Sequence, residues 1–427
     1  MKGGSRLLLG ILCAALTAAF PPSTLRAGPV RTFGIGGEGI AMGGAVAAFS
    51  SDYAAMFYNP AGLAFSEGPT LGFGFVYGSP ELRISGQKQD VEPIRAFQVG
   101  GSLPLGPSKY LRRITLGVAA HIPTSTAITV GAMDPVKPHF VFYAIDPQTT
   151  AIYLGGSVRI LPTLSFGGGV SILAEAEFNL NLSLLSTTFI THYSPSRFNF
   201  DPVLGLRFNP TPFLSLAAVY REAKTASLEP ELRIFVGDEQ ILPTISVFNL
   251  FNYEPREVVV AAMYRFMERF VVEVDVNWMD YSDYEVSTPR YDFDEEVPDW
   301  VKTLMSMHNF PDPGFQDIFV PRLGLAFEVN RYVTLRAGYF YHPSPVPDQR
   351  GITNYADADQ HVVCFGTGVR LFPPPKVLER PILIDVVFQA QIFENRSVVK
   401  DDPEDPVGNY AIDGEILLGS VFVKHVF

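Results

Sequence analysis

The sequence predicts an all-β protein, a 14-stranded antiparallel transmembrane β-barrel. Three observations predict this class. About fourteen segments alternate apolar and polar residues, the connections between them alternate between short and long, and an export signal precedes them all. Bacterial outer-membrane barrels have an even number of strands, tight periplasmic turns and longer outer loops.

The first 27 residues have the features of a signal peptide. Two basic residues precede an apolar stretch, 7–20, that is too short to span a bilayer, and we expect cleavage between Ala19 and Gly28. Cys364 then remains alone, so no intramolecular disulfide can form. No later run of 18 apolar residues predicts a membrane helix. A net charge of −12 argues against a nucleic-acid partner.

The predicted strands show two faces of different character. In 270–281, Val274 and Val276 share one face, whereas Glu273 and Asp275 share the other. A soluble sandwich would bury the apolar face, but the export signal and the sorted loops favour a barrel with its apolar face toward lipid. The predicted strands are 71–77, 95–103, 113–122, 150–160, 164–178, 198–208, 213–221, 256–266, 270–281, 318–329, 332–341, 361–372, 381–393 and 414–427.

Residues 28–70 lie between the signal peptide, 1–27, and the barrel, 71–427, and do not have a strand pattern. They are rich in Gly and in small apolar residues, with one helix expected near 43–49. Three glycines match the G-x-G-x-x-G spacing of dinucleotide-binding loops, but no βαβ unit surrounds them. Close backbone packing inside another structure explains them better.

A motif in this segment resembles a known family. The stretch GGEGIAMGGAVAAFSSDYAAMFYNPAGLA, 36–64, is similar to the N-terminus of the FadL family of outer-membrane transporters, in which Asn-Pro-Ala precedes the first strand. The matching residues are Asn59, Pro60 and Ala61, followed by Gly62. The fourteen strands and the terminal Phe extend the resemblance over the mature chain.

The resemblance implies a function as well as a fold. It implies a hatch in the lumen and passive uptake of long-chain fatty acids or other hydrophobic molecules. Substrate would land on the outer loops, enter a lumen pocket and leave sideways through the wall. Some relatives with a similar N-terminus act in protein secretion or surface assembly, and this role is the alternative hypothesis.

Candidate substrate-binding residues fall in three places. Those near the Asn-Pro-Ala motif are Phe57, Tyr58, Leu63 and Phe65. Two apolar outer loops, 241–253 and 298–315, contribute Phe248, Phe251, Trp300, Leu304 and Met305. Among the inward-facing charges, Arg159 and Arg336 could hold a carboxylate headgroup. The competing interpretations are loops that pack on each other to cap the barrel, and charges that pair with one another in the lumen.

The remaining expectations concern partners and location. Phe427 ends the last strand and is expected to serve as a membrane-insertion signal for the barrel-assembly machinery. Other expected partners are outer-membrane lipid, lipopolysaccharide and hydrophobic small molecules, in the bacterial outer membrane. The seven His lack metal-ligand spacing, no G-x-S-x-G motif occurs, and Glu273 with Asp275 fits a polar lumen face. We therefore expect neither an enzyme nor a bound cofactor or metal.

Overall fold

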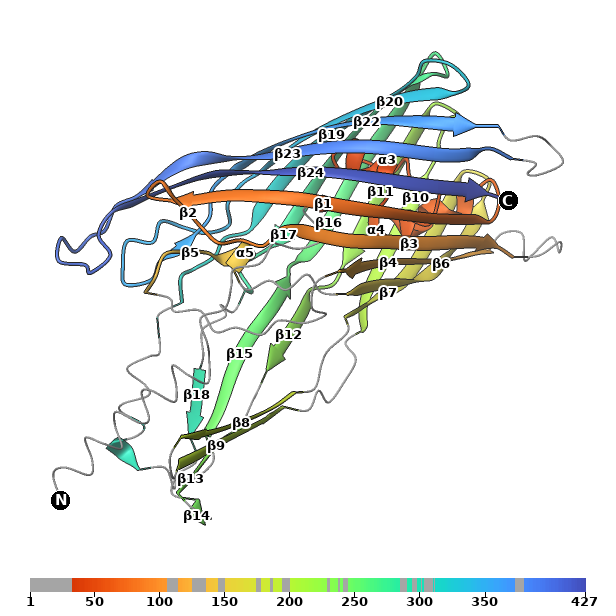
Figure 1. Cartoon of the computed structure of the whole chain (residues 1–427). Coiled ribbons are helices and arrows are strands. Elements are labelled where there is room, and N and C mark those ends of the chain that lie inside the picture. Colours follow the sequence, from red (N-terminus) through yellow and green to blue (C-terminus); the bar gives the residue numbers. More distant parts are fainter. Residues whose placement is uncertain are drawn as a thin grey trace, which may run out of the picture.

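The computed structural model describes residues 33–105, 114–124, 136–144, 150–173, 178–184, 187–193, 200–228, 231–236, 239–240, 245–284, 290–293, 298–300, 302, 310, 312–372 and 380–427. Within these ranges, fourteen strands form one antiparallel barrel, closed where β1 pairs with β3 (Figure 1). The strands are β1 (Thr70–Ile84), β3 (Ile94–Pro104), β4 (Ile114–Pro123), β6 (Ala151–Leu161), β7 (Leu164–Leu173), β10 (Phe200–Phe208), β11 (Leu214–Arg221), β16 (Arg256–Phe266), β17 (Phe270–Asp280), β19 (Ile318–Glu328), β20 (Val333–His342), β22 (Gln360–Leu371), β23 (Ile382–Val398) and β24 (Tyr410–Val426). The predicted fold class is confirmed.

The alternation of side chains along each strand sets the orientation of the wall. On β17, Val274 and Val276 are 47% and 42% exposed, whereas Glu273 and Asp275 are 0% and 1% exposed. Successive side chains in a strand point to opposite faces, so the apolar set faces lipid and the charged set faces the lumen. The predicted orientation is confirmed.

Three strands are much longer than predicted. β1 has 15 residues, and β23 and β24 have 17 each, so the connections from β1 to β3 and from β23 to β24 are shorter than expected. The first predicted strand ended at Tyr77, before Gly78–Ser79–Pro80. Pro80 is tolerated because β1 pairs with β3 only up to Gly78, and proline fits a strand edge that needs no N–H donor.

A second sheet of seven strands continues from the outer ends of β11 and β16 and extends away from the barrel (Figure 1). It contains β8 (Phe178–Leu184), β9 (Thr187–Tyr193), β12 (Lys224–Leu228), β13 (Glu231–Val236), β14 (Glu239–Gln240), β15 (Ile245–Glu254) and β18 (Arg290–Phe293). The prediction of a loop at 241–253 is therefore wrong for 245–253, which belong to β15. Their β-branched and aromatic residues favour a strand, and β12 pairs with them beyond the barrel.

The hatch lies inside the barrel and has little regular structure (Figure 1). Its elements are α3 (Gly37–Ala41), α4 (Ala55–Tyr58) and the 3₁₀ turn η1 (Pro60–Phe65). The helix expected near 43–49 is wrong, because Gly43 and Gly44 have φ of 64° and 76° and end the helical turn before them. In the described part of the chain, no helix is long and apolar enough to cross a membrane.

Candidate functional site: the hatch and the lumen wall

Asn59 is the central polar residue of the hatch and is fully buried. Its Oδ1 accepts a hydrogen bond from the Ala61 N–H at 3.1 Å and caps η1. Its Nδ2 donates to the carbonyls of Ala47 at 2.8 Å and of Leu206, on β10, at 3.1 Å. One side chain therefore joins two parts of the hatch to the wall. Proline follows at the first position of the turn, where its missing N–H costs nothing.

Wall glycines make room for this turn. A Cβ atom at Gly205 of β10 would lie 2.0 Å from Asn59 Oδ1, and one at Gly167 of β7 would lie 2.2 Å from the Ala61 nitrogen. Farther along the lumen, a Cβ atom at Gly338 of β20 would lie 2.2 Å from the Gly43 nitrogen. Because no other residue lacks a Cβ, these strand positions let the hatch backbone touch the wall backbone.

Wall arginines hold the carbonyl groups of the hatch. Arg207 donates to Ser50 O at 3.1 Å, and Arg322 donates to Gly43 O at 2.8 Å. Arg159 donates to Ala64 O, and Arg221 donates to Phe57 O. Burying a guanidinium is tolerated when such bonds replace its water.

Wall carboxylates accept hydrogen bonds from N–H groups of the hatch backbone. Glu273 accepts a hydrogen bond from the Ala48 N–H at 2.6 Å, and Asp275 accepts one from the Ala47 N–H at 3.3 Å. Gln98 of β3 supplies both roles, since its Oε1 accepts from Gly36 N and its Nε2 donates to Gly34 O, each at 2.9 Å. The wall thus takes over hydrogen bonds that regular structure would otherwise provide to the hatch backbone.

A charged cluster fixes the other end of the hatch. Arg336 contacts Asp385 of β23 and Glu38 of α3, each at 2.7 Å, and Lys424 of β24 contacts Asp52 at 2.6 Å. Burial alone would raise the pKa of Glu38, but the nearby Lys424 and Arg336 lower the pKa to about 2. Glu38 therefore stays ionised throughout the pH range in which bacteria grow.

The candidate residues near the motif lie together in the hatch. Phe57 packs edge-on against Tyr58 at 4.9 Å and against Tyr153 of β6 at 5.4 Å between ring centroids. Leu63 is fully buried, and Tyr58 accepts the Ile35 N–H through its hydroxyl at 3.0 Å. The ring of Phe65 lies between two guanidinium groups, those of Arg159 and Arg207, each centred 4.7 Å from it. These residues pack the hatch against the wall.

A small cavity of about 30 Å³ lies between the hatch and the wall. Its lining combines the rings of Phe57, Tyr58 and Phe340 with the charged groups of Arg221 and Asp275. A cavity of this volume is too small for an aromatic ring or an alkyl chain, and the hatch packs against the wall around it.

The other candidates belong to parts of the chain outside the hatch. Trp300 is half exposed, and Phe248 and Phe251 belong to β15. Leu304 and Met305 lie outside the described residues. Phe427 is 57% exposed beside the last strand, on the lipid-facing side with Val423. Its role in insertion stays a prediction.

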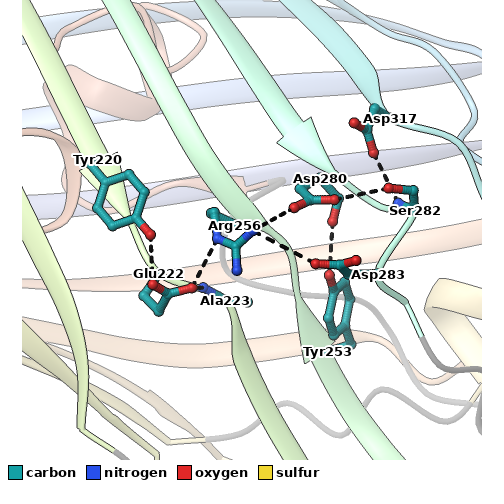
Figure 2. A network of polar contacts seen from close by, with 9 residues as sticks. All are labelled: Tyr220, Glu222, Ala223, Tyr253, Arg256, Asp280, Ser282, Asp283 and Asp317. Atoms are coloured by element: carbon teal, nitrogen blue, oxygen red, sulfur yellow. Dashed lines mark hydrogen bonds and ion pairs between the residues drawn. The ribbon is translucent and has the colours of Figure 1, made fainter.

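Two aromatic residues of the outer rim lie close to the end of β17. Tyr281, directly after this strand, is buried. Its neighbour Tyr253 donates a hydrogen bond to Asp280 O at 2.8 Å, inside a polar network that Arg256 extends to Glu222 (Figure 2). This network joins the outer ends of β11, β16 and β17. Among the described residues, no group of His, Cys, Asp or Glu is placed to hold a metal ion.

Comparison with known proteins agrees with this architecture. Residues 253–415 match the family model described as outer membrane protein transport protein (OMPP1/FadL/TodX). Over these residues the chain is similar to that family. Alkane uptake protein A of Marinobacter nauticus is 24% identical over 97% of the chain and 95% of its own length. The chain is thus similar to outer-membrane transport proteins, and its location is the outer membrane.

Solved structures show the same fold. A Pseudomonas aeruginosa FadL homologue has a TM-score of 0.62 at 13% identity, covering 93% of this chain and 100% of its own. The Pseudomonas putida toluene transporter TodX has a TM-score of 0.59 at 18% identity, covering 93% and 99%.

Proposed function

We propose that this protein admits hydrophobic molecules passively through the outer membrane, and that its preferred substrates are neutral hydrocarbons rather than fatty acids. The substrate preference rests on one observation: the terminal nitrogens of the wall arginines already bond to groups of the protein itself. Arg336 directs both terminal nitrogens to carboxylates of the protein, and Arg221 directs its own to Glu257 and Phe57 O. A fatty-acid headgroup would have to displace these buried partners, which is costly in a water-poor site.

The charges around the lumen cavity also favour a neutral substrate. Arg221 and Arg322 line it together with Glu257 and Asp275, so the lining has as many carboxylates as guanidinium groups and no excess positive charge for an anionic ligand. A neutral hydrocarbon needs no compensating charge, and the rings of Phe57 and Phe340 offer it apolar contact. The name of the relative in Marinobacter, an alkane uptake protein, fits this preference.

The route we propose begins at the outer loops, passes a lumen pocket that forms when the hatch shifts, and leaves sideways into the membrane. Every barrel strand in the described structure is paired on both sides, so lateral exit requires a local opening of the wall. No energy-coupling step is needed, because the substrate moves down its own gradient.

Uptake of labelled hexadecane and labelled oleate tests the proposal. Cells with the protein should take up hexadecane several-fold faster than cells without it, whereas oleate uptake should be unchanged. Equal stimulation of both substrates would refute the preference for neutral molecules. No stimulation of either, together with a protein partner that co-purifies, would favour the secretion or assembly role instead.

A further inference from the structure

A short segment of an outer loop crosses the mouth of the barrel above the hatch. We call residues 137–144 the outer strap; it contains β5 (His139–Phe140) and α5 (Val141–Ala144). On one side, Phe140 and Tyr143 pack edge-on against Phe393 of β23, with ring centroids 6.0 and 5.7 Å apart. On the other side, Val141 belongs to the buried cluster of β17, β19 and β20. The strap, which belongs to the loop between β4 and β6, therefore contacts the wall at β23 and at β17, β19 and β20.

The ring of Phe142 sits in a nest of aromatic side chains. Its centroid lies 5.5 Å from that of Tyr281, and 6.2 Å from those of Tyr284 and Phe315. These three, which we call the aromatic nest, are each at most 8% exposed, and Tyr284 also packs on Tyr253 at 4.8 Å. The nest is held to the barrel rim, because Tyr253 is fixed to β17 through the network of Figure 2.

The backbone attachments of the strap are short compared with those of the wall. It pairs in parallel with β21 (Tyr355–Ala356) over two residues, and His139 N donates to Asn354 O at 3.2 Å. Wall strands β1 and β24 pair over fifteen residues. Both partners of the short pairing come from outer loops, 124–150 and 343–359, so the strap can leave without breaking a wall strand.

From these contacts we infer that the aromatic nest is a binding site for the hydrophobic substrate, and that Phe142 occupies it in the closed channel. The inference deepens the proposed function and rests on it. The nest takes a neutral apolar group of about the size of one ring or a few methylenes, since Phe142 is the group that fills it. A substrate that displaces Phe142 moves the strap and opens the mouth above the hatch.

A reversible disulfide tests the strap as a gate. His139→Cys with Tyr355→Cys places two thiols at paired positions of β5 and β21, and the native Cys364 is buried on β22. Oxidation should lower hexadecane uptake at least tenfold, and a reducing agent should restore it. The reduced form of the same protein is the matched control. Equal uptake in both states, with the disulfide verified by mass spectrometry, would overturn the gate.

A fluorescence test reports on the nest without transport. Phe142→Trp in a background of Trp278→Phe and Trp300→Phe leaves one indole in the chain. In lipid nanodiscs, toluene or octane should shift its emission to longer wavelength and at least double its quenching by acrylamide. A protein that keeps Trp278 alone, on the lipid-facing side of β17, controls for hydrocarbon in the bilayer.

The uptake and fluorescence measurements distinguish the proposed transport from the proposed binding site. If no variant takes up hydrocarbon but the introduced indole leaves the nest on titration, the proposed transport fails and the binding site stands. If uptake is normal but neither the indole nor the disulfide has any effect, the proposed function stands and the inference about Phe142 is refuted.

Discussion

Replacing Asn59 by Ala tests whether the hatch is held by side-chain hydrogen bonds. The change removes three bonds and leaves two buried groups, the Ala61 N–H and the Ala47 carbonyl, and the part-buried Leu206 carbonyl without that partner. At the lower limit of about 1 kcal/mol for each unmet group, docking of the hatch weakens by about 3 kcal/mol. Since about 1.4 kcal/mol is a factor of ten, the undocked population should rise on the order of 100-fold.

Hydrogen exchange of the hatch amides in nanodiscs measures this population directly. Protection of amides in 37–65 should fall on the order of 100-fold, while wall strands keep theirs, because opening is confined to the hatch. The matched control is Asn330→Ala, which removes two hydrogen bonds, to the N–H groups of Tyr332 and Val333, at an exposed turn. If Asn59→Ala and Asn330→Ala leave hatch protection equal within threefold, the hydrogen bonds of Asn59 do not hold the hatch.

Three further predictions follow from the same contacts. Gly205→Ala should displace the hatch and raise ion conductance in planar bilayers, since the new Cβ would lie 2.0 Å from Asn59 Oδ1; Gly419→Ala, which meets nothing within 4 Å, should not. Glu38 has a folded pKa of about 2, below its ordinary 4.5, so its contribution to hatch docking is complete above pH 4.5 and is lost as pH falls toward 2. Constant hatch protection from pH 5 to pH 2 would contradict this. Burial raises the pKa of Asp357, in an outer loop, to about 7. The stabilisation is therefore complete below the ordinary pKa of 3.8 and is lost as pH rises to 7, so Asp357→Asn should raise the thermal midpoint at pH 8 but change it little at pH 3.

The sequence alone predicted the strands of the wall well, because the alternation of apolar and polar residues is a local pattern. Alternation in 270–281 places Val274 and Glu273 on opposite faces whatever the rest of the chain does, and all fourteen predicted segments are barrel strands. The limits of the prediction lay where turn residues occur within a strand, as at Pro80, and where a strand continues outside the membrane, as in β15. There the neighbouring strand, rather than the local pattern, decides the structure.

The hatch and the mouth depended on contacts between distant residues. The sequence determined that Asn59 would need buried partners, because an amide wrapped in apolar residues cannot be left unsatisfied. Only the tertiary structure decided that one partner is Leu206, 147 positions away, and that Arg336 pairs with Glu38 and Asp385. Likewise, no local sequence pattern predicts that the ring of Phe142 packs on that of Phe315. Closing the barrel fixes which lumen side chains face each other, and this geometry cannot be read from any single strand.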